Sequence, residues 1–190
     1  MIVTLCSGEG RTFAAVTRVL GALVTDMITN VATAPVRQKA RSLGVTEHCV
    51  PHIDFATRQE HEEALFAELK MCKPFKMIFL LGYMRIFSEQ FLNNLRAAWP
   101  QCSIVNLHPA PLSLYKGANG LVHALKIRAP LWGISVHEVT AKLDEGPLLA
   151  YSSLVVHPND TFELLRERAH TQEVAAVLEA IDKLSRRQST

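Results

Sequence analysis

The sequence lacks the features that mark membrane-spanning, secreted and nucleic-acid-binding proteins. Its longest strongly apolar run, Met77 to Met84, is much shorter than the roughly 20 residues that cross a bilayer. Its first residues have neither the basic end nor the cleavage site of a signal peptide. Lys and Arg number 20 against 18 for Asp and Glu, so no basic excess points to nucleic acid. We therefore expect a cytoplasmic protein that binds neither a membrane nor nucleic acid.

Cysteine is scarce and shows no pairing pattern. The four cysteines form no CxxC pair. Cys6 and Cys102 lie inside apolar runs that are typical of buried strands, where a thiol behaves as a small apolar side chain. This usage predicts reduced thiols, as in a cytoplasmic protein, rather than a disulfide framework.

Histidine is more abundant, with eight residues, but its spacing does not suit a metal. His48 and His52 are four residues apart, yet Pro51 between them argues against a shared helix face. His137 and the remaining histidines stand outside any such pattern, and spacing alone gives them no role. We expect no metal site.

Length and composition suit one globular domain over residues 1–190. Hydrophobic residues make up 48% of the chain and charged residues 20%, which are ordinary values for a folded protein. So much apolar material disfavours disorder and is enough for one core.

Apolar runs alternate with helix-like stretches along the whole chain. Thr57 and Glu60 have the spacing of a capping box, Ser88 can cap a second helix, and Asp160 to Glu163 form another cap signal. The expected strands are 2–6, 27–31, 49–50, 77–81, 102–107, 133–139 and 148–156. The expected helices are about 11–23, 35–43, 57–71, 89–97, 120–127 and 162–185, the last with an apolar side of Leu164, Leu165, Val174, Val177, Leu178 and Ile181.

This alternation predicts a doubly wound, mainly parallel α/β sheet with helices on both faces. The last two strands follow each other directly and could be an antiparallel addition. In such folds, ligands bind beyond the carboxyl ends of the strands.

Two polar side chains lie at such a strand end. Side chains alternate along a strand, so Asn106 and His108 point the same way. An amide can stabilise an oxyanion and an imidazole can move a proton near neutral pH, a pair that suits acyl chemistry. The alternative is a strand-end turn in which both residues make local hydrogen bonds.

A second polar segment, Leu-Asp-Glu-Gly-Pro at 143–147, lies between two expected strands. Asp and Gly are ordinary turn residues, so the segment could be a turn only. If it folds over the same edge, Asp144 could orient His108 or position a water.

The segment at 7–12, Ser-Gly-Glu-Gly-Arg-Thr, follows the first strand and begins a helix. Free amides at a helix N-terminus bind phosphate. Phe13 stands where a dinucleotide-binding loop has its third glycine, and no Gly-Lys-Ser/Thr follows, so neither common nucleotide motif is present. An ordinary tight turn explains the segment equally well.

Together these segments resemble the folate-dependent formyltransferases over most of the chain. Asn106-Leu107-His108-Pro109 matches the family's Asn-x-His-Pro segment, and 143–147, preceded by Gly-Ile-Ser-Val-His at 133–137, matches its second active-site segment. Residues 81–87, Leu-Gly-Tyr-Met-Arg-Ile-Phe, are similar to its folate-binding segment, and 170–173, His-Thr-Gln-Glu, to the segment that contacts the substrate. The phosphate loop departs from the family, with Arg11 and Thr12 in place of Ser and Asn.

The resemblance implies that 10-formyltetrahydrofolate donates a formyl group to a primary amine. The implied acceptor is a small phosphorylated amine, phosphoribosylglycinamide in purine biosynthesis, and no metal or nucleotide cofactor is needed. Asn106 would hold the oxyanion, His108 would act as general acid and base, and Asp144 would orient His108. The implied folate site comprises Arg58, Met84, Arg85, Ile86, Phe87, Val139, Thr140 and Leu143. The implied acceptor site comprises Gly10, Arg11, Thr12 and Glu173.

Three alternatives stay open at this point. The protein could formylate another amine, such as an amino sugar or a hydroxylamine. It could hydrolyse formyltetrahydrofolate, or it could be a folate-binding protein without activity. Formylation of methionyl-tRNA is disfavoured by the near-neutral charge. We expect a monomer or a homodimer.

Overall fold

The chain forms two compact units, and the boundary between Val105 and Asn106 lies inside strand β5 (Ser103–His108). The computed structural model describes residues 1–187. In this part of the chain, seven strands follow the order β3-β2-β1-β4-β5-β6-β7. The pairs β1–β2, β1–β4 and β2–β3 are parallel, and β6–β7 is antiparallel. The predicted α/β sheet is thus confirmed, and its treatment as a single domain stays a prediction.

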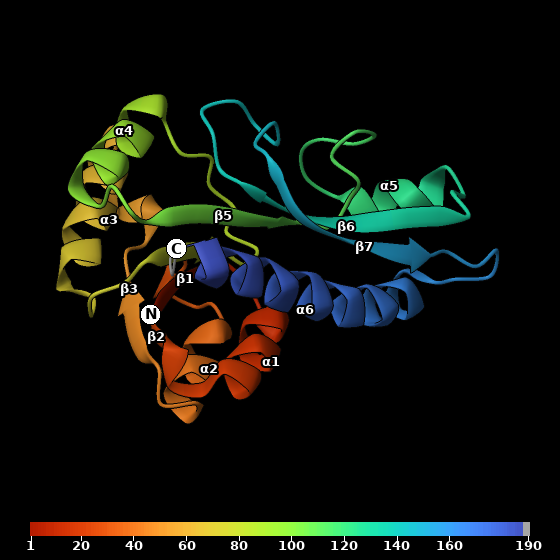
Figure 1. Cartoon of the computed structure of the whole chain (residues 1–190), viewed down its shortest axis with the longest axis horizontal. Helices are drawn as coiled ribbons and strands as arrows, with labels where there is room; N and C mark the ends of the chain where they lie inside the picture. Colours follow the sequence, from red (N-terminus) through yellow and green to blue (C-terminus); the bar gives the residue numbers. More distant parts are fainter. Residues whose placement is uncertain (188–190) are drawn as a thin grey trace. The chain divides into compact units, whose positions relative to one another are not determined.

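The first unit is a parallel sheet covered by helices on both faces. Helices α1 and α2 pack together on one face, and α3 and α4 lie on the other (Figure 1). Every residue of β1, β2 and β4 is buried, and for β1 and β4 the continuous apolar runs predict this. The strands are β1 (Ile2–Cys6), β2 (Val24–Thr29), β3 (Thr46–Cys49) and β4 (Met77–Leu80), and the α-helices are α1 (Arg11–Leu20), α2 (Val36–Ser42), α3 (Arg58–Met71) and α4 (Glu89–Ala98).

The helix starts follow the capping signals in the sequence. Thr57 and Glu60 form the predicted capping box at the start of α3. Ser88 accepts the Phe91 N–H at 3.0 Å and so caps α4. These side chains satisfy amides that the first helical turn leaves without partners, which explains why each helix begins where it does.

Strands β2 and β3 each begin three residues earlier than predicted. β2 begins at Val24 rather than Met27 and includes the polar residues Thr25 and Asp26, both buried. The hydroxyl of Thr25 donates to the Ile2 carbonyl at 3.4 Å, and Asp26 pairs with a histidine of β3. Buried polar groups need such partners, and these partners lie on neighbouring strands rather than nearby in sequence.

The second unit contains an antiparallel pair backed by one long helix. Helix α6 (Phe162–Arg187) runs along β7 (Leu148–Val155) and also contacts β6 (Leu131–Glu138), while α5 (Gly120–Lys126) packs on α6 (Figure 1). The β6–β7 register places Trp132 opposite Leu154 and Val136 opposite Ala150, which are all buried.

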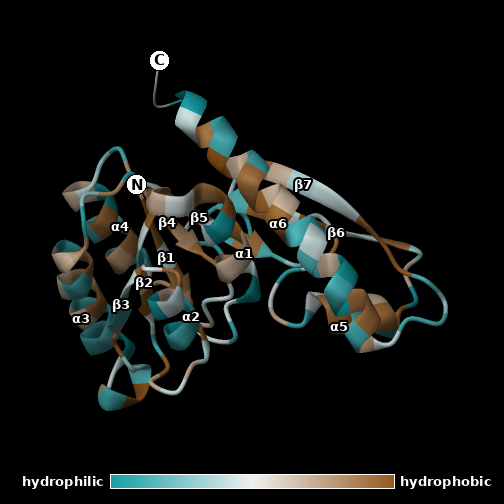
Figure 2. Cartoon of the chain, turned by 90° about the horizontal axis from the view of Figure 1, so that it is seen from below, coloured by the Kyte–Doolittle hydropathy of each residue, from teal (hydrophilic) through white to brown (hydrophobic). Residues whose placement is uncertain are grey.

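Helix α6 alternates hydrophilic and hydrophobic residues along its length (Figure 2). Leu165, Val177 and Ile181 are buried, as predicted. Leu164 is 56% exposed, so its assignment to the apolar side is wrong. Adjacent helical residues point about 100° apart, and in the first turn Leu165 takes the buried position.

The cysteines agree with the prediction of free thiols. All four are free, and Cys6 is buried in β1. Cys102 lies one residue before β5 and is half-buried. Of the two cysteines that were expected inside strands, only Cys6 therefore lies in one.

Within residues 1–187, no helix is both long enough and apolar enough to cross a membrane.

Candidate active site

The second unit gathers polar side chains at the end of β5 and in the loop that follows β6. Asn106 and His108 are two residues apart on β5 and so share a face. Asn106 contacts His137, while His108 and His137 both contact Asp144. The structure thus brings the three predicted catalytic residues into one cluster, and the alternative of separate local turns does not describe them.

His108 is buried between a carboxylate and a backbone carbonyl. Its Nδ1 lies 3.6 Å from Asp144 Oδ2, and its Nε2 lies 3.0 Å from the carbonyl oxygen of Tyr115. A carbonyl can only accept, so the proton of this contact belongs to Nε2. The imidazole therefore carries its hydrogen on the side away from Asp144 unless both nitrogens are protonated.

Asp144 is the buried anion of the cluster. It accepts the Gly117 N–H at 2.7 Å and lies within ion-pair distance of both histidines. Burial opposes its charge, but the contact with His137, the N–H of Gly117 and the proximity of the two imidazoles lower the pKa of Asp144 below its ordinary value. Asp144 is therefore ionised throughout the neutral range.

His137 belongs to the cluster although its spacing in the sequence gave it no role. Its Nδ1 donates to the Glu138 carbonyl at 2.9 Å, which leaves Nε2 as an acceptor in the neutral ring. Nε2 lies 3.1 Å from Asn106 Nδ2 and 3.5 Å from Asp144 Oδ1. A neutral His137 thus accepts one N–H of Asn106, and the second N–H of that amide is available to another acceptor.

The loops on either side of the cluster are tied to each other. Lys116 Nζ lies 2.7 Å from Glu145 Oε1, next to the contact between Gly117 and Asp144. Asp144 has a positive φ of 52°, a conformation that side chains other than glycine adopt rarely. Gly146 lies so close to Glu138 that an added Cβ would be 1.7 Å from its carbonyl oxygen. This close approach holds Asp144 next to the end of β6.

Three predicted folate-site residues follow β6 in the same unit. Val139 and Thr140 are half-buried, and Leu143 is 47% exposed. The Thr140 hydroxyl donates to the Lys142 carbonyl at 3.1 Å, which fixes the start of this loop. These residues lie in the loop that ends at Asp144, so they share their segment with the catalytic cluster.

Residues 81–88 of the first unit carry exposed apolar side chains without being a helix or strand. Met84 is 71% exposed and Ile86 is 56% exposed, so neither belongs to the core. Phe87 is buried against Tyr83 and Phe91, with ring centroids 5.8 and 4.8 Å away, and Arg85 is half-buried. The side chain of Phe87 therefore supports the segment, whereas Met84 and Ile86 present apolar surface to solvent.

Arg58 lies beside the end of this segment. Its Nε is 3.3 Å from Glu62 Oε1. Glu62 also accepts the Ser88 N–H at 2.7 Å and the Ser88 hydroxyl at 2.5 Å. The buried carboxylate of Glu62 thus connects the predicted folate arginine to the cap of α4.

The loop at 7–12 is a tight turn in which Gly10 is required. Gly10 has a φ of +64°, and an added Cβ would lie 2.2 Å from Val36 Cγ2. Arg11 begins α1 and is half-buried, and Thr12 is buried. Lys39 donates to the Glu9 carbonyl at 2.5 Å, which places a second cation beside the loop.

The remaining predicted residue, Glu173, lies in the middle of α6. Glu173, Arg166 and His170 are all half-buried, so the polar stripe they form is not a fully solvated helix face. His170 Nε2 is a buried nitrogen without a hydrogen-bond partner.

The predicted site residues therefore fall into two sets. Gly10, Arg11, Thr12, Arg58 and residues 84–87 belong to the first unit, and Asn106, His108, Val139, Thr140, Leu143, Asp144 and Glu173 belong to the second. Sequence reasoning missed His137 and Glu62, each of which contacts a predicted site residue.

An α/β sheet whose strand end carries an amide, two imidazoles and a buried carboxylate has the chemistry of an acyl-transfer protein. The sequence model of the formyl transferase family matches residues 1–181, and the chain belongs to that family.

Named relatives and a solved structure are similar to most of the chain. The chain is 30% identical over 179 residues to phosphoribosylglycinamide formyltransferase of Escherichia coli strain K12, covering 92% of this chain and 82% of the relative. It is 29% identical over 136 residues to the trifunctional purine biosynthetic protein adenosine-3 of Drosophila melanogaster, of which it spans 10%. The crystal structure of phosphoribosylglycinamide formyltransferase from Brucella melitensis superposes with a TM-score of 0.83 at 32% identity, covering 96% of this chain and 93% of that one.

Proposed function

We propose that the protein transfers a formyl group from 10-formyltetrahydrofolate to the amine of phosphoribosylglycinamide. The observation that carries this proposal is the buried, ionised Asp144 held between two histidines beside Asn106. Relatives that span most of the chain bear the name of this activity, which supports the choice of donor and acceptor.

Asn106 would stabilise the tetrahedral intermediate. The amine attacks the formyl carbon, and the formyl oxygen takes the negative charge. His137 accepts one N–H of Asn106, which orients the amide and leaves its second N–H to donate to that oxygen. One such donor typically contributes roughly 3 kcal/mol to lowering the barrier.

His108 would move the protons. The attacking ammonium must lose a proton, and the leaving folate nitrogen must gain one. The Nε2–H of His108 donates to the Tyr115 carbonyl, and exchange of this acceptor for the substrate would direct the proton to the reacting atoms. The carboxylate of Asp144, 3.6 Å from Nδ1, would stabilise the imidazolium that forms.

The two substrates would bind through residues of different chemistry. In the first unit, Met84 and Ile86 offer exposed apolar surface for the pterin ring, next to the predicted folate residues Arg58 and Arg85. In the second unit, the predicted folate residues Val139, Thr140 and Leu143 lie in the loop that ends at Asp144. Gly10, Arg11 and Thr12 at the start of α1 would hold the acceptor's phosphate, because a helix N-terminus and its dipole favour an anion. Glu173 would face the acceptor's ammonium or ribose hydroxyls. A cytoplasmic location and a monomeric or homodimeric state stay predictions.

The test is to measure the loss of 10-formyltetrahydrofolate by the purified protein with and without phosphoribosylglycinamide. Loss that requires the amine supports the transferase. Loss without any amine identifies a hydrolase, and no loss with retained folate binding identifies a binding protein. Loss with an amino sugar or a hydroxylamine, but not with phosphoribosylglycinamide, identifies a transferase for another acceptor.

A variant at the phosphate loop tests the acceptor separately. We expect Arg11→Ala to raise the KM for phosphoribosylglycinamide at least tenfold, to leave the folate Kd unchanged, and to weaken the salt dependence of acceptor binding. Lys39→Ala is the matched control, because it removes the other positive charge beside the loop and leaves Arg11 in place. An unchanged KM in Arg11→Ala would exclude this phosphate site.

A further inference from the structure

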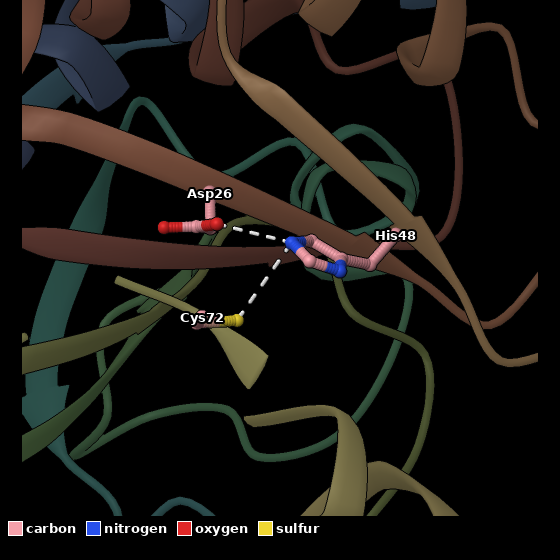
Figure 3. A group of neighbouring side chains, drawn as sticks. All are labelled: Asp26, His48 and Cys72. Atoms are coloured by element: carbon pink, nitrogen blue, oxygen red, sulfur yellow. Dashed lines mark hydrogen bonds and ion pairs between the residues drawn. The ribbon is translucent and has the colours of Figure 1, made fainter. Parts of the chain in front are cut away.

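Three side chains with metal-binding chemistry meet in the first unit, far along the chain from one another. Asp26 lies on β2, His48 on β3, and Cys72 directly follows α3. In the parallel pairing of β2 with β3, Ile28 lies opposite His48, so Asp26, two residues before Ile28, shares its face of the sheet with His48. Figure 3 shows that one imidazole nitrogen faces both the carboxylate and the sulfur.

The distances suit a single small cation. His48 Nε2 lies 3.0 Å from Asp26 Oδ1 and 3.9 Å from Cys72 Sγ, and the three ligand atoms lie within 4.8 Å of one another. Ligands around a tetrahedral zinc ion are separated by about 3.3–3.6 Å, given bonds of roughly 2.0–2.3 Å. The two His48 distances differ from these values by a few tenths of an ångström, and Asp26 and Cys72, within 4.8 Å of each other, would approach by at most about 1.2 Å to complete three bonds.

The neighbours of the cluster hold its members in ligand orientation. His48 Nδ1 lies 2.6 Å from Glu68 Oε1, so this nitrogen donates to the carboxylate, and Nε2 is the nitrogen directed at Asp26 and Cys72. The second oxygen of Asp26, Oδ2, accepts the Lys73 N–H at 3.3 Å, which leaves Oδ1 for the cation. An imidazole fixed by a carboxylate on its far side is the usual arrangement around a protein-bound metal.

The cluster needs a positive charge at its centre. An Nε2 lone pair directed at a carboxylate oxygen 3.0 Å away is repulsive unless a proton or a metal lies between them. The side chains of Asp26 and His48 are only 2% and 11% exposed, so water does not screen this repulsion.

We propose that Asp26, His48 and Cys72 bind one divalent transition metal ion of the zinc type, with a water as the fourth ligand. Metal ligation uses the thiolate of Cys72 and the neutral imidazole of His48, so binding releases the protons that these ligand atoms carry. Thiolate and imidazole ligands favour Zn²⁺ or Co²⁺ over Mg²⁺ and Ca²⁺.

The ion would have a structural role, independent of formyl transfer. Cys72 follows the end of α3 and precedes β4, so the site lies toward the amino ends of the parallel strands. Ligands of the proposed reaction belong at the opposite, carboxyl ends. The metal would join β2, β3 and the end of α3, three segments that are linked there by the contacts of His48 and Asp26.

The test uses the metal alone. The purified protein, stripped by a chelator under reducing conditions, is titrated with Co²⁺, and a thiolate-to-cobalt charge-transfer band is followed in the near ultraviolet. We expect one equivalent to saturate the band and Zn²⁺ to abolish it by displacement. The His108–His137–Asp144 cluster contains no thiol, so binding there cannot produce this band.

Two variants decide the assignment. Cys72→Ser should abolish the band, whereas Cys102→Ser, at another half-buried free cysteine, should retain it. Zn²⁺ at about 100 times its Kd should raise the Tm of the wild type by roughly 5–10 °C, and Mg²⁺ should not raise it. A missing band in the wild type, or a band that persists in Cys72→Ser, would overturn the proposal.

Glu68→Gln keeps all three ligands and tests the site even if Cys72→Ser does not fold. Glu68 is partly exposed on α3, so the substitution spares the core. We expect Co²⁺ affinity to fall tenfold to a hundredfold with the same final band, because the orienting carboxylate is lost. Unchanged affinity would argue that His48 is a simple ion-pair partner and against the metal site.

Discussion

Replacement of Asp144 by Asn removes one charge from the catalytic cluster and changes its shape very little. The Asn oxygen can still accept the Gly117 N–H, which lies 2.7 Å from Asp144 Oδ2. The charge lost is 3.6 Å from His108 Nδ1, and both side chains are 5% exposed. Two unit charges at that distance attract by roughly 4–5 kcal/mol at an effective dielectric constant of about 20.

The carboxylate also interacts with His137 and the Gly117 amide, so the net attraction to His108 is smaller than this value. We therefore expect Asp144→Asn to lose about 3–4 kcal/mol of transition-state stabilisation, which is a fall in kcat of roughly 10²–10³-fold. Folate affinity should stay within about threefold, because the charge acts on the imidazolium rather than on bound folate.

The assay is steady-state loss of 10-formyltetrahydrofolate, with folate Kd measured by calorimetry. Glu145→Gln is the control, since it removes the neighbouring charge that pairs with exposed Lys116. A kcat within tenfold of the wild type, or a loss of folate binding without a loss of turnover, would refute the role of Asp144.

Stability against pH gives a second measurement on the same variant. The pKa of Asp144 is lowered in the folded protein, so its charge stabilises the fold above the unfolded pKa near 4 and loses this effect as pH falls through the folded pKa. The Tm difference between wild type and Asp144→Asn should be full from about pH 5 to 8 and should shrink below about pH 4. A difference that grew on acidification would contradict this sign.

Four further variants test the fold and the folate segment. Gly10→Ala should destabilise the protein by roughly 2–3 kcal/mol in urea unfolding, because its Cβ would clash with Val36 at a positive φ; an unchanged midpoint would contradict this. Ile86→Asp should weaken folate binding at least tenfold with a Tm within about 2 °C of wild type, because the side chain is 56% exposed; unfolding seen by circular dichroism would instead place Ile86 in the core. Leu165→Ala should cost about 2–5 kcal/mol, and Leu164→Ala less than about 0.5 kcal/mol; equal costs would overturn their different burial.

Local signals in the sequence predicted most of the fold. The apolar run of β1 and the caps at Thr57 and Ser88 are determined by neighbouring residues, so the sequence alone places them correctly. The predicted start of β2 at Met27 was wrong because Asp26 is charged, and a charged residue is expected outside a buried strand. Its burial depends on His48, which is 22 residues away in the chain.

In the candidate site, too, features set by neighbouring residues were predicted and contacts between distant residues were not. Asn106 and His108 are two residues apart on one strand, and their shared face follows from strand geometry. His137 is 31 residues from Asn106, and its contact depends on how β6 and the loop to Asp144 fold. The one available signal was its place six residues before the start of the Leu-Asp-Glu-Gly-Pro segment, near the end of the expected strand 133–139.

The segment that carries Met84 and Ile86 is anchored at both ends. The Met84 N–H donates to the Ser7 hydroxyl at 2.7 Å, and Ser88 is held by the carboxylate of Glu62. A ring that docks on these side chains therefore meets a surface already in place, and little chain entropy is lost on binding. Loss of the Ser7 anchor would leave the contacts with the ligand intact and appear as a less favourable binding entropy. In the proposed folate site, affinity at this loop would thus depend on the residues that anchor it, through the freedom of the unbound state.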